Sequence, residues 1–182
     1  MKCYKLLEAD NQQIITDKLY EFIINKTDIL AQELFWNDVN IIEILNDIPE
    51  LTDFFVKYNL VSPTRMSIIC VPNNSSVGKN IHIDQPGENI RLLWPIKNCQ
   101  GSFTRFFKVD SNFIKLQYLD NGVPFYHITD STTHTMIDEL ELLVPVIFNS
   151  AMPHGICPNP DSLESRLTFT AHFENSLDHY LM

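Results

Sequence analysis

The stretch RLTFTAHF, residues 166–173, decides the fold class, because polar and apolar residues alternate along it without a break. Side chains along a β-strand point alternately to its two faces. One face would carry only Leu167, Phe169, Ala171 and Phe173. The other would carry Arg166, Thr168, Thr170 and His172. We expect helices to pack on the apolar face, whereas a cation on an inward polar face requires an anion beside it.

Seven further runs with strand character precede this stretch, from about residue 61 onward. They are SIICV (67–71), NIHID (80–84), IRLLWPI (90–96), SFTRFFKV (102–109), FIKLQYL (113–119), VPFYHIT (123–129) and LLVPVIF (142–148). Turn sequences separate them, at Pro72-Asn73-Asn74, Pro86-Gly87, Asn121-Gly122 and Pro158-Asn159-Pro160. Eight short strands spaced by roughly ten residues are typical of a β-sandwich or barrel.

The first 60 residues have helical character instead. The runs NQQIITDKLYEFI (11–23) and VNIIEILNDIPELTDFFVKYNL (39–60) place apolar residues on one helical face. Pro49 is expected to begin a new helix after Asp47. The sequence therefore predicts a mainly β fold with N-terminal helices, a jelly-roll-like double sheet with the helices packed on one sheet.

Composition predicts one domain over 1–182, with helical support at 1–60, a β core at 61–174 and a tail at 175–182. The chain of 182 residues is 45% hydrophobic, enough for one core. Its net charge of −10 disfavours nucleic acid and leaves a small molecule or a peptide as the expected partner. The start, MKCYKLLEADNQQ, has no signal-peptide character and no run of 18 apolar residues occurs, so we expect a cytoplasmic protein without membrane association. Four scattered cysteines are expected to be free thiols.

His82 and Asp84 form the first half of a candidate metal site. They are two positions apart in a predicted strand, so both side chains point to one face. A further histidine on that face would complete two imidazoles and one carboxylate. This is the facial triad of non-heme Fe(II) oxygenases, which leaves open positions on the metal.

Five other histidines are candidates for the third ligand. We expect His127 and His134 to be exposed or hydrogen-bonded at a strand end, and His179 to be solvated. His172 begins a second short motif, His172-Phe173-Glu174, but no arginine follows it. His154 differs, because it lies just beyond an apolar strand and upstream of the alternating stretch.

Arg166 follows His154 by 12 positions, a spacing that fits a hairpin returning beside it. Arg166 could then face the same cavity as the metal ligands. A guanidinium suits such a position because its rigid fork binds a carboxylate bidentately and stays charged. Thr168 lies on the same face and can donate one more hydrogen bond.

The series His82-x-Asp84, His154 and Arg166-x-Thr168 resembles the pattern of the Fe(II)/2-oxoglutarate-dependent dioxygenase superfamily over roughly residues 61–174. The resemblance implies a double-stranded β-helix, the jelly-roll or cupin-like barrel. It implies Fe(II) bound by the two histidines and the aspartate. It also implies 2-oxoglutarate as cosubstrate, its distal carboxylate paired with Arg166 and assisted by Thr168. The implied activity is hydroxylation of a C–H bond with dioxygen, releasing succinate and CO2.

Arg91 lies nine residues after His82. The aspartyl/asparaginyl hydroxylase-like branch has an arginine at a similar offset that helps to hold the cosubstrate, which implies the same for Arg91. The stretch 146–169 is also similar to that branch and to small oxygenases of viral and marine microbial origin. An ion pair of Arg91 with Glu88 or another acid is the alternative.

Three alternatives concern other residues. Arg65-Met66-Ser67 also reads Arg-x-Ser, but it precedes every histidine. Cys157 could act as a soft metal ligand, which would make a different site. Trp94, Phe106 and Tyr126 could line a substrate pocket, although aromatic residues on strands are more often part of a core.

A jelly-roll without this activity stays open as a second function, either a cupin-type module that binds a metal or small ligand, or a structural protein. An Arg166 buried against Asp or Glu would favour that second function. The loops expected to select a substrate, around 72–80, 97–102 and 120–135, carry no signature for one. The sequence predicts no particular oligomeric state.

Overall fold

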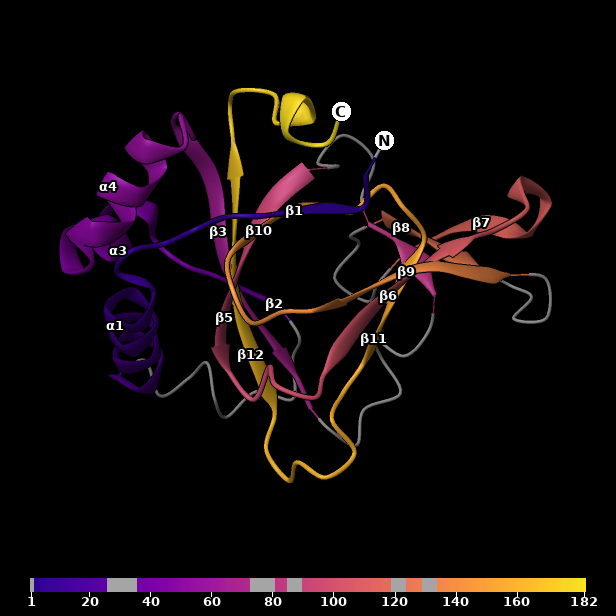
Figure 1. The fold of residues 1–182 in the computed structure, drawn as a ribbon, viewed down its shortest axis with the longest axis horizontal. Coiled ribbons are helices and arrows are strands. Elements are labelled where there is room, and N and C mark those ends of the chain that lie inside the picture. Colours follow the sequence, from indigo (N-terminus) through magenta and orange to yellow (C-terminus); the bar gives the residue numbers. More distant parts are fainter. Residues whose placement is uncertain (1, 26–35, 73–80, 85–89, 119–123, 129–133) are drawn as a thin grey trace.

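Two antiparallel sheets of six strands each make up the β part of the molecule (Figure 1). The computed structural model describes residues 2–25, 36–72, 81–84, 90–118, 124–128 and 134–182. Three α-helices lie within these ranges. The fold is therefore mainly β, as the alternating stretch predicted.

Sheet A consists of β1 (Tyr4–Leu6), β10 (Val146–Asn149), β5 (Ile90–Lys97), β12 (Arg166–Phe173), β3 (Pro63–Val71) and β2 (Trp36–Asp38), in that spatial order. Sheet B consists of β7 (Ile114–Tyr118), β8 (Pro124–Ile128), β4 (His82–Ile83), β11 (His154–Cys157), β6 (Phe103–Lys108) and β9 (Thr135–Glu141). From β3 to β6, and again from β9 to β12, successive strands alternate between the sheets. This alternation makes the sandwich a double-stranded β-helix.

The helices α1 (Gln12–Asn25), α3 (Ile41–Asp47) and α4 (Pro49–Lys57) lie on the outer face of sheet A (Figure 1). The predicted break is confirmed, since Pro49 occupies the first turn of α4 directly after α3 has ended. Asn40 caps α3 by accepting hydrogen bonds from two backbone N–H groups of its first turn. None of the helices in the described part of the chain has the length and hydropathy to cross a bilayer.

The main apolar core lies between these helices and sheet A. Its fully buried members include Ile15, Leu19, Ile23, Leu51, Leu92, Trp94, Phe169 and Ala171. The indole N–H of Trp94 donates to Thr16 Oγ1 at 2.9 Å, which ties α1 to β5. A surface hollow of about 330 Å³ between α4 and the start of β3 also lies on this helix side, outside the space between the sheets.

The alternation of β12 is confirmed in three dimensions. Phe169 and Ala171 are buried in the helix-side core. The polar residues Arg166, Thr168, Thr170 and His172 are buried as well, on the face toward sheet B. A second apolar cluster fills part of the space between the sheets, with Cys3, Leu93, Phe106, Leu140, Leu142, Val146 and Phe148. The rest of that space is polar, and the candidate site lies there.

All eight predicted strands are present, and four strands were missed. The missed strands are β1, β2, β9 and β11. β9 (TMIDELE) is rich in acids, and β11 is only four residues long, so neither has a clear apolar periodicity. The predicted turns at Pro86-Gly87 and Asn121-Gly122, and most of Pro72-Asn73-Asn74, lie outside the described residues. The four cysteines are free thiols, as predicted.

Candidate metal centre

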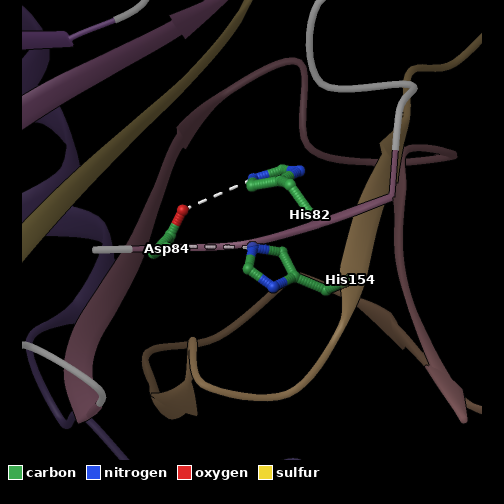
Figure 2. Close-up of side chains that lie close together, drawn as sticks. All are labelled: His82, Asp84 and His154. Carbon is green, nitrogen blue, oxygen red and sulfur yellow. Dashed lines mark ion pairs between the residues drawn. The ribbon is translucent and has the colours of Figure 1, made fainter. Parts of the chain in front are cut away.

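Two neighbouring strands of sheet B carry the predicted metal ligands. β4 and β11 pair antiparallel with His82 directly opposite His154, so both imidazoles project from one face. Their ring centroids are 4.4 Å apart. Asp84 follows His82 by two positions and points to the same side. Figure 2 shows the two imidazoles side by side, with a contact from each to the Asp84 carboxylate.

The spacing of these three side chains fits a metal ion. His82 Nε2 lies 3.4 Å from Asp84 Oδ1, and His154 Nε2 lies 3.7 Å from Asp84 Oδ2. An octahedral ion with bonds of about 2.1 Å separates neighbouring ligand atoms by about 3 Å, so small side-chain rotations complete the geometry. Two imidazoles and a carboxylate are compatible with Fe(II). Within the described ranges this is the single cluster of His, Cys, Asp or Glu with metal-ligand spacing.

The backbone carbonyl of Met152 sets the tautomer of His154. Nδ1 of His154 lies 2.8 Å from that oxygen, which can only accept, so Nδ1 carries the proton and Nε2 offers its lone pair to the triad. Burial, followed by the neighbouring His82, lowers the pKa of His154 well below its ordinary value of 6.5. The ring is therefore neutral at pH 7, as a metal ligand must be.

Arg91, on β5 of sheet A, reaches across to Asp84 beside sheet B. Its Nη2 donates to Asp84 Oδ2 in an ion pair. Burial, with a smaller effect from Arg65, lowers the pKa of Arg91 to about 9, so the guanidinium stays charged at neutral pH. From the sequence, Arg91 could pair either with an acid or with the cosubstrate. In the structure it pairs with an acid, Asp84. Glu88, the acid considered first, lies outside the described residues.

Arg166 is buried at the start of β12, with only 3% of its surface exposed. Its Nη1 donates to Thr104 Oγ1 of β6 at 3.5 Å, and its Nε has no hydrogen-bond partner within the described ranges. Across those ranges, no carboxylate lies within ion-pair distance of Arg166. Thr168 is buried on the same face. A buried guanidinium with one long hydrogen bond is under-satisfied, and a carboxylate fits its fork of donors.

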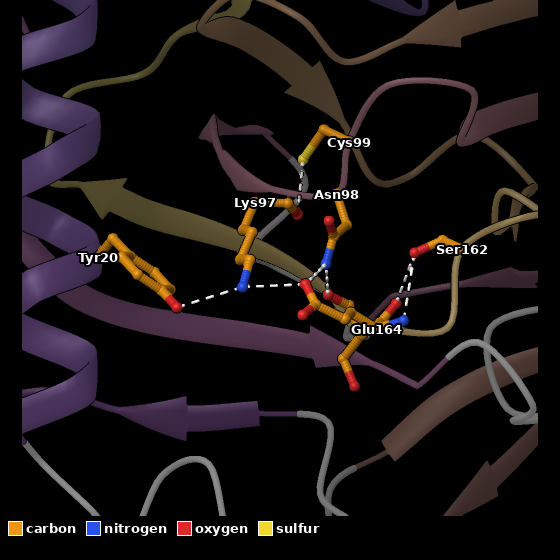
Figure 3. Close-up of polar contacts among 7 residues, drawn as sticks. Tyr20, Lys97, Asn98, Cys99, Ser162 and Glu164 are labelled. Carbon is orange, nitrogen blue, oxygen red and sulfur yellow. Dashed lines mark hydrogen bonds and ion pairs between the residues drawn. The ribbon is translucent and has the colours of Figure 1, made fainter.

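A polar network holds the segment directly before Arg166 (Figure 3). Lys97, the last residue of β5, donates to Tyr20 Oη of α1 at 3.2 Å and pairs with Glu164 Oε2 at 2.9 Å. Asn98 Nδ2 donates to the same carboxylate at 3.2 Å and to the carbonyl of Ser165 at 2.9 Å. These bonds tie the chain just ahead of β12 to β5 and α1, which positions Arg166.

Two further bonds brace the same segment, and Figure 3 draws the second of them. The buried thiol of Cys99 donates to the carbonyl oxygen of Leu167 at 3.4 Å. Ser162 Oγ donates to the carbonyl oxygen of Glu164 at 3.1 Å. The loop between β11 and β12 is thereby held through the Glu164 carboxylate and through the backbone carbonyls of Glu164 and Ser165.

The aromatic candidates divide between the core and the site. Phe106 is fully buried between the sheets, with its ring centroid 6.4 Å from that of His154, and Phe148 packs edge-on to His154 at 5.0 Å. These rings shield one side of His154 from water. Trp94 belongs to the helix-side core instead. Tyr126 pairs with Ile83, so it lies on the face of sheet B away from the triad.

The remaining histidines and Cys157 lie outside the metal-ligand cluster. His134 packs edge-on to Phe107 with centroids 4.9 Å apart. His179 is exposed in a short 3-10 helix, Asp178–Tyr180, as expected for a solvated residue. His172 is buried between the sheets, where desolvation, then Arg91 and Arg65, lower its pKa to about 3.

Sequence reasoning missed two neighbours of the site. Thr104 was not singled out, although it contacts Arg166 from the opposite sheet. His127 was expected to be exposed or bonded at a strand end, whereas it lies directly opposite His82 on β8. Both placements depend on strand register and on the apposition of the sheets, for which the sequence carries no local signal.

Two solved structures are similar to this chain over most of its length. The chain is similar to a prolyl-4-hydroxylase from Pseudomonas putida, with 11% identity, a TM-score of 0.45, and coverage of 95% of this chain and 85% of that one. It is also similar to a structure of prolyl 4-hydroxylases from Phytophthora capsici, with 16% identity, a TM-score of 0.48, and coverage of 96% of this chain and 59% of that one. No protein-family model matches the chain. No curated protein matches it either.

The chain has the double-stranded β-helix fold together with a His-x-Asp…His triad, as the superfamily resemblance predicted. The order of strands in the two sheets defines this fold, and His82, Asp84 and His154 form the triad. The narrower branch, with the aspartyl/asparaginyl hydroxylase-like and viral or marine enzymes, stays a prediction.

Proposed function

We propose that this protein is an Fe(II)- and 2-oxoglutarate-dependent dioxygenase. It would hydroxylate a C–H bond of a small molecule or peptide and release succinate and CO2. The observation that carries the proposal is the position of buried, under-satisfied Arg166 in the same inter-sheet space as the triad. A metal site and a separate carboxylate site in one polar interior suit a cosubstrate that has a chelating end and a distal carboxylate.

Each side chain then has a definite task. His82, Asp84 and His154 would hold the metal, and Met152 keeps the Nε2 of His154 available. Bound Fe(II) would supply the activation of dioxygen and the coupled oxidation of 2-oxoglutarate and substrate.

The second sheet supplies the remaining groups. Arg166 and Thr168 would bind the distal carboxylate of 2-oxoglutarate. Thr104, from the opposite sheet, accepts a hydrogen bond from the guanidinium. Arg91 orients the Asp84 carboxylate. A direct contact of Arg91 with the cosubstrate, as in the branch named above, is part of the same proposal.

The second candidate, a cupin-type binding or structural jelly-roll, has less support. It is favoured if an acid neutralises Arg166, and among the described residues none does. Arg166, without an acidic partner among the described residues, suits a protein that binds a dicarboxylate, because a desolvated dicarboxylate requires a paired cation.

Anaerobic absorption spectroscopy tests the proposal. Wild-type protein with Fe(II) is expected to develop a visible charge-transfer band when 2-oxoglutarate is added. His154→Ala should lose the band by losing the metal. Arg166→Lys should keep the metal but need at least tenfold more 2-oxoglutarate, because it lacks the bidentate fork. A wild-type protein with no band would leave the binding module as the better explanation.

A further inference from the structure

The inner face of the β7–β8 hairpin continues the face that carries the triad. His127 of β8 pairs directly opposite His82, and Lys115 of β7 pairs directly opposite His127. Directly opposed residues of antiparallel strands point to the same face. Lys115, His127, His82 and His154 therefore form one row across four adjacent strands of sheet B.

This row extends away from the position proposed for the cosubstrate. Arg166 contacts sheet B at Thr104 of β6. In that sheet β11 lies between β6 and β4. The hairpin lies on the other side of β4, at the opposite end of the sheet order from β6 and β9. A carboxylate at Arg166 and a ligand at the hairpin would thus occupy opposite sides of the metal.

The hairpin face has the chemistry of an anion site beside an apolar platform. Lys115 is exposed, and no carboxylate of the described residues lies within ion-pair distance of it. His127 has a buried Nδ1 without a hydrogen-bond partner in the described ranges. Gln117 and Phe125 form the next pair on the same face, toward Asp84. A cation, an imidazole, an amide and a ring are thereby gathered at the edge of the triad.

We propose that this face, centred on Lys115 and His127, binds a carboxylate of the substrate. This rests on the proposed oxygenase function and specifies its substrate class. Adjacent strands are about 4.8 Å apart, so the Lys115 backbone lies about 10 Å from that of His82. The substrate would carry its carboxylate within about this distance of the oxidised carbon, as an amino acid or an acidic peptide does.

Lysine on an edge strand has a second use, since it discourages pairing with another chain. β7 is the outer strand of sheet B, so this use applies to Lys115. A protective lysine affects solubility and leaves substrate affinity unchanged. Lys5 on β1, the outer strand of sheet A, is also exposed and serves as the matched control.

Succinate release over a panel of matched acids and amides tests the proposal. The panel contains free amino acids, their carboxamides, and peptides with and without an acidic residue. The acids are expected to be turned over and their amides to be at least tenfold poorer. Lys115→Gln and His127→Gln should raise KM for the acids by about tenfold with the Fe(II)–2-oxoglutarate band retained, whereas Lys5→Gln should match wild type. Free amino acids and peptides serve as separate arms, which distinguishes the two sources of the carboxylate.

Calorimetric titration of the same pairs into zinc-loaded protein with 2-oxoglutarate gives a readout independent of turnover. Equal binding of acids and amides, no binding by either, or unchanged affinity in Lys115→Gln overturns the carboxylate site. A normal charge-transfer band with no preference for acids contradicts only this inference. A missing band contradicts the proposed function itself, and the titration then still decides whether the hairpin binds carboxylates.

Discussion

Arg91 of sheet A holds the carboxylate of Asp84, which follows a strand of sheet B. The two residues are only seven positions apart in sequence, yet their strands belong to different sheets. The candidate metal carboxylate is thus oriented by a cation from the opposite wall of the interior. The guanidinium is 2% exposed, so it depends strongly on a negative partner.

Asp84→Asn should therefore destabilise the metal-free protein. Removing the carboxylate leaves the buried guanidinium of Arg91 without that charge, and breaking a buried pair in this way costs about 3 kcal/mol. The free energy of unfolding in urea, measured with a chelator present, checks this. His82→Asn, which removes a metal ligand but keeps both members of the Arg91–Asp84 ion pair, is the control. Equal stability of the two variants would contradict an orienting role for Arg91.

Thr104→Val should weaken 2-oxoglutarate binding and leave metal binding intact. Valine keeps the shape of threonine but removes the acceptor for Arg166. Loss of one long hydrogen bond predicts an increase of about threefold to tenfold in KM for 2-oxoglutarate. Thr135→Val, at an exposed position of β9, is a matched control. A change in metal affinity as large as the change in KM would show that Thr104 acts elsewhere.

Asn98 should control the placement of Arg166 through the network in Figure 3. Its φ of 55° is left-handed, a conformation that asparagine and glycine tolerate best. Asn98→Ala adds strain to the loss of two hydrogen bonds, so we expect a loss of about 2 kcal/mol in unfolding free energy. Asn98→Gly removes the hydrogen bonds alone and should still raise KM for 2-oxoglutarate. An unchanged KM in Asn98→Gly would separate this network from the cosubstrate.

His172 should make the protein less stable in acid. Its folded pKa is about 3, because it is buried near Arg91 and Arg65, whereas an unfolded histidine titrates near 6.5. Between these values the unfolded chain binds more protons, so stability falls as pH drops below 6.5 and is flat above it. His172→Gln should reduce the slope of unfolding free energy by up to about 1.4 kcal/mol per pH unit in that window. Parallel profiles of variant and wild type would contradict this origin.

The sequence alone determined features that depend on neighbouring residues. Alternation along residues 166–173 identified both faces of β12, because side-chain direction in a strand has a period of two. Pro49 marked the break between α3 and α4, because a helix tolerates proline only in its first turn. The order His82, Asp84, His154, Arg166 pointed to the triad and its companion cation.

Only the tertiary structure decided which of these groups meet. The register that sets His82 between His154 and His127 depends on strand pairing, and a slip of one residue would turn each side chain to the other face. The contacts of Arg91 with Asp84 and of Arg166 with Thr104 each join two sheets that share no strand. Such contacts follow from how the sheets pack face to face, which is a property of the whole chain and of no local segment.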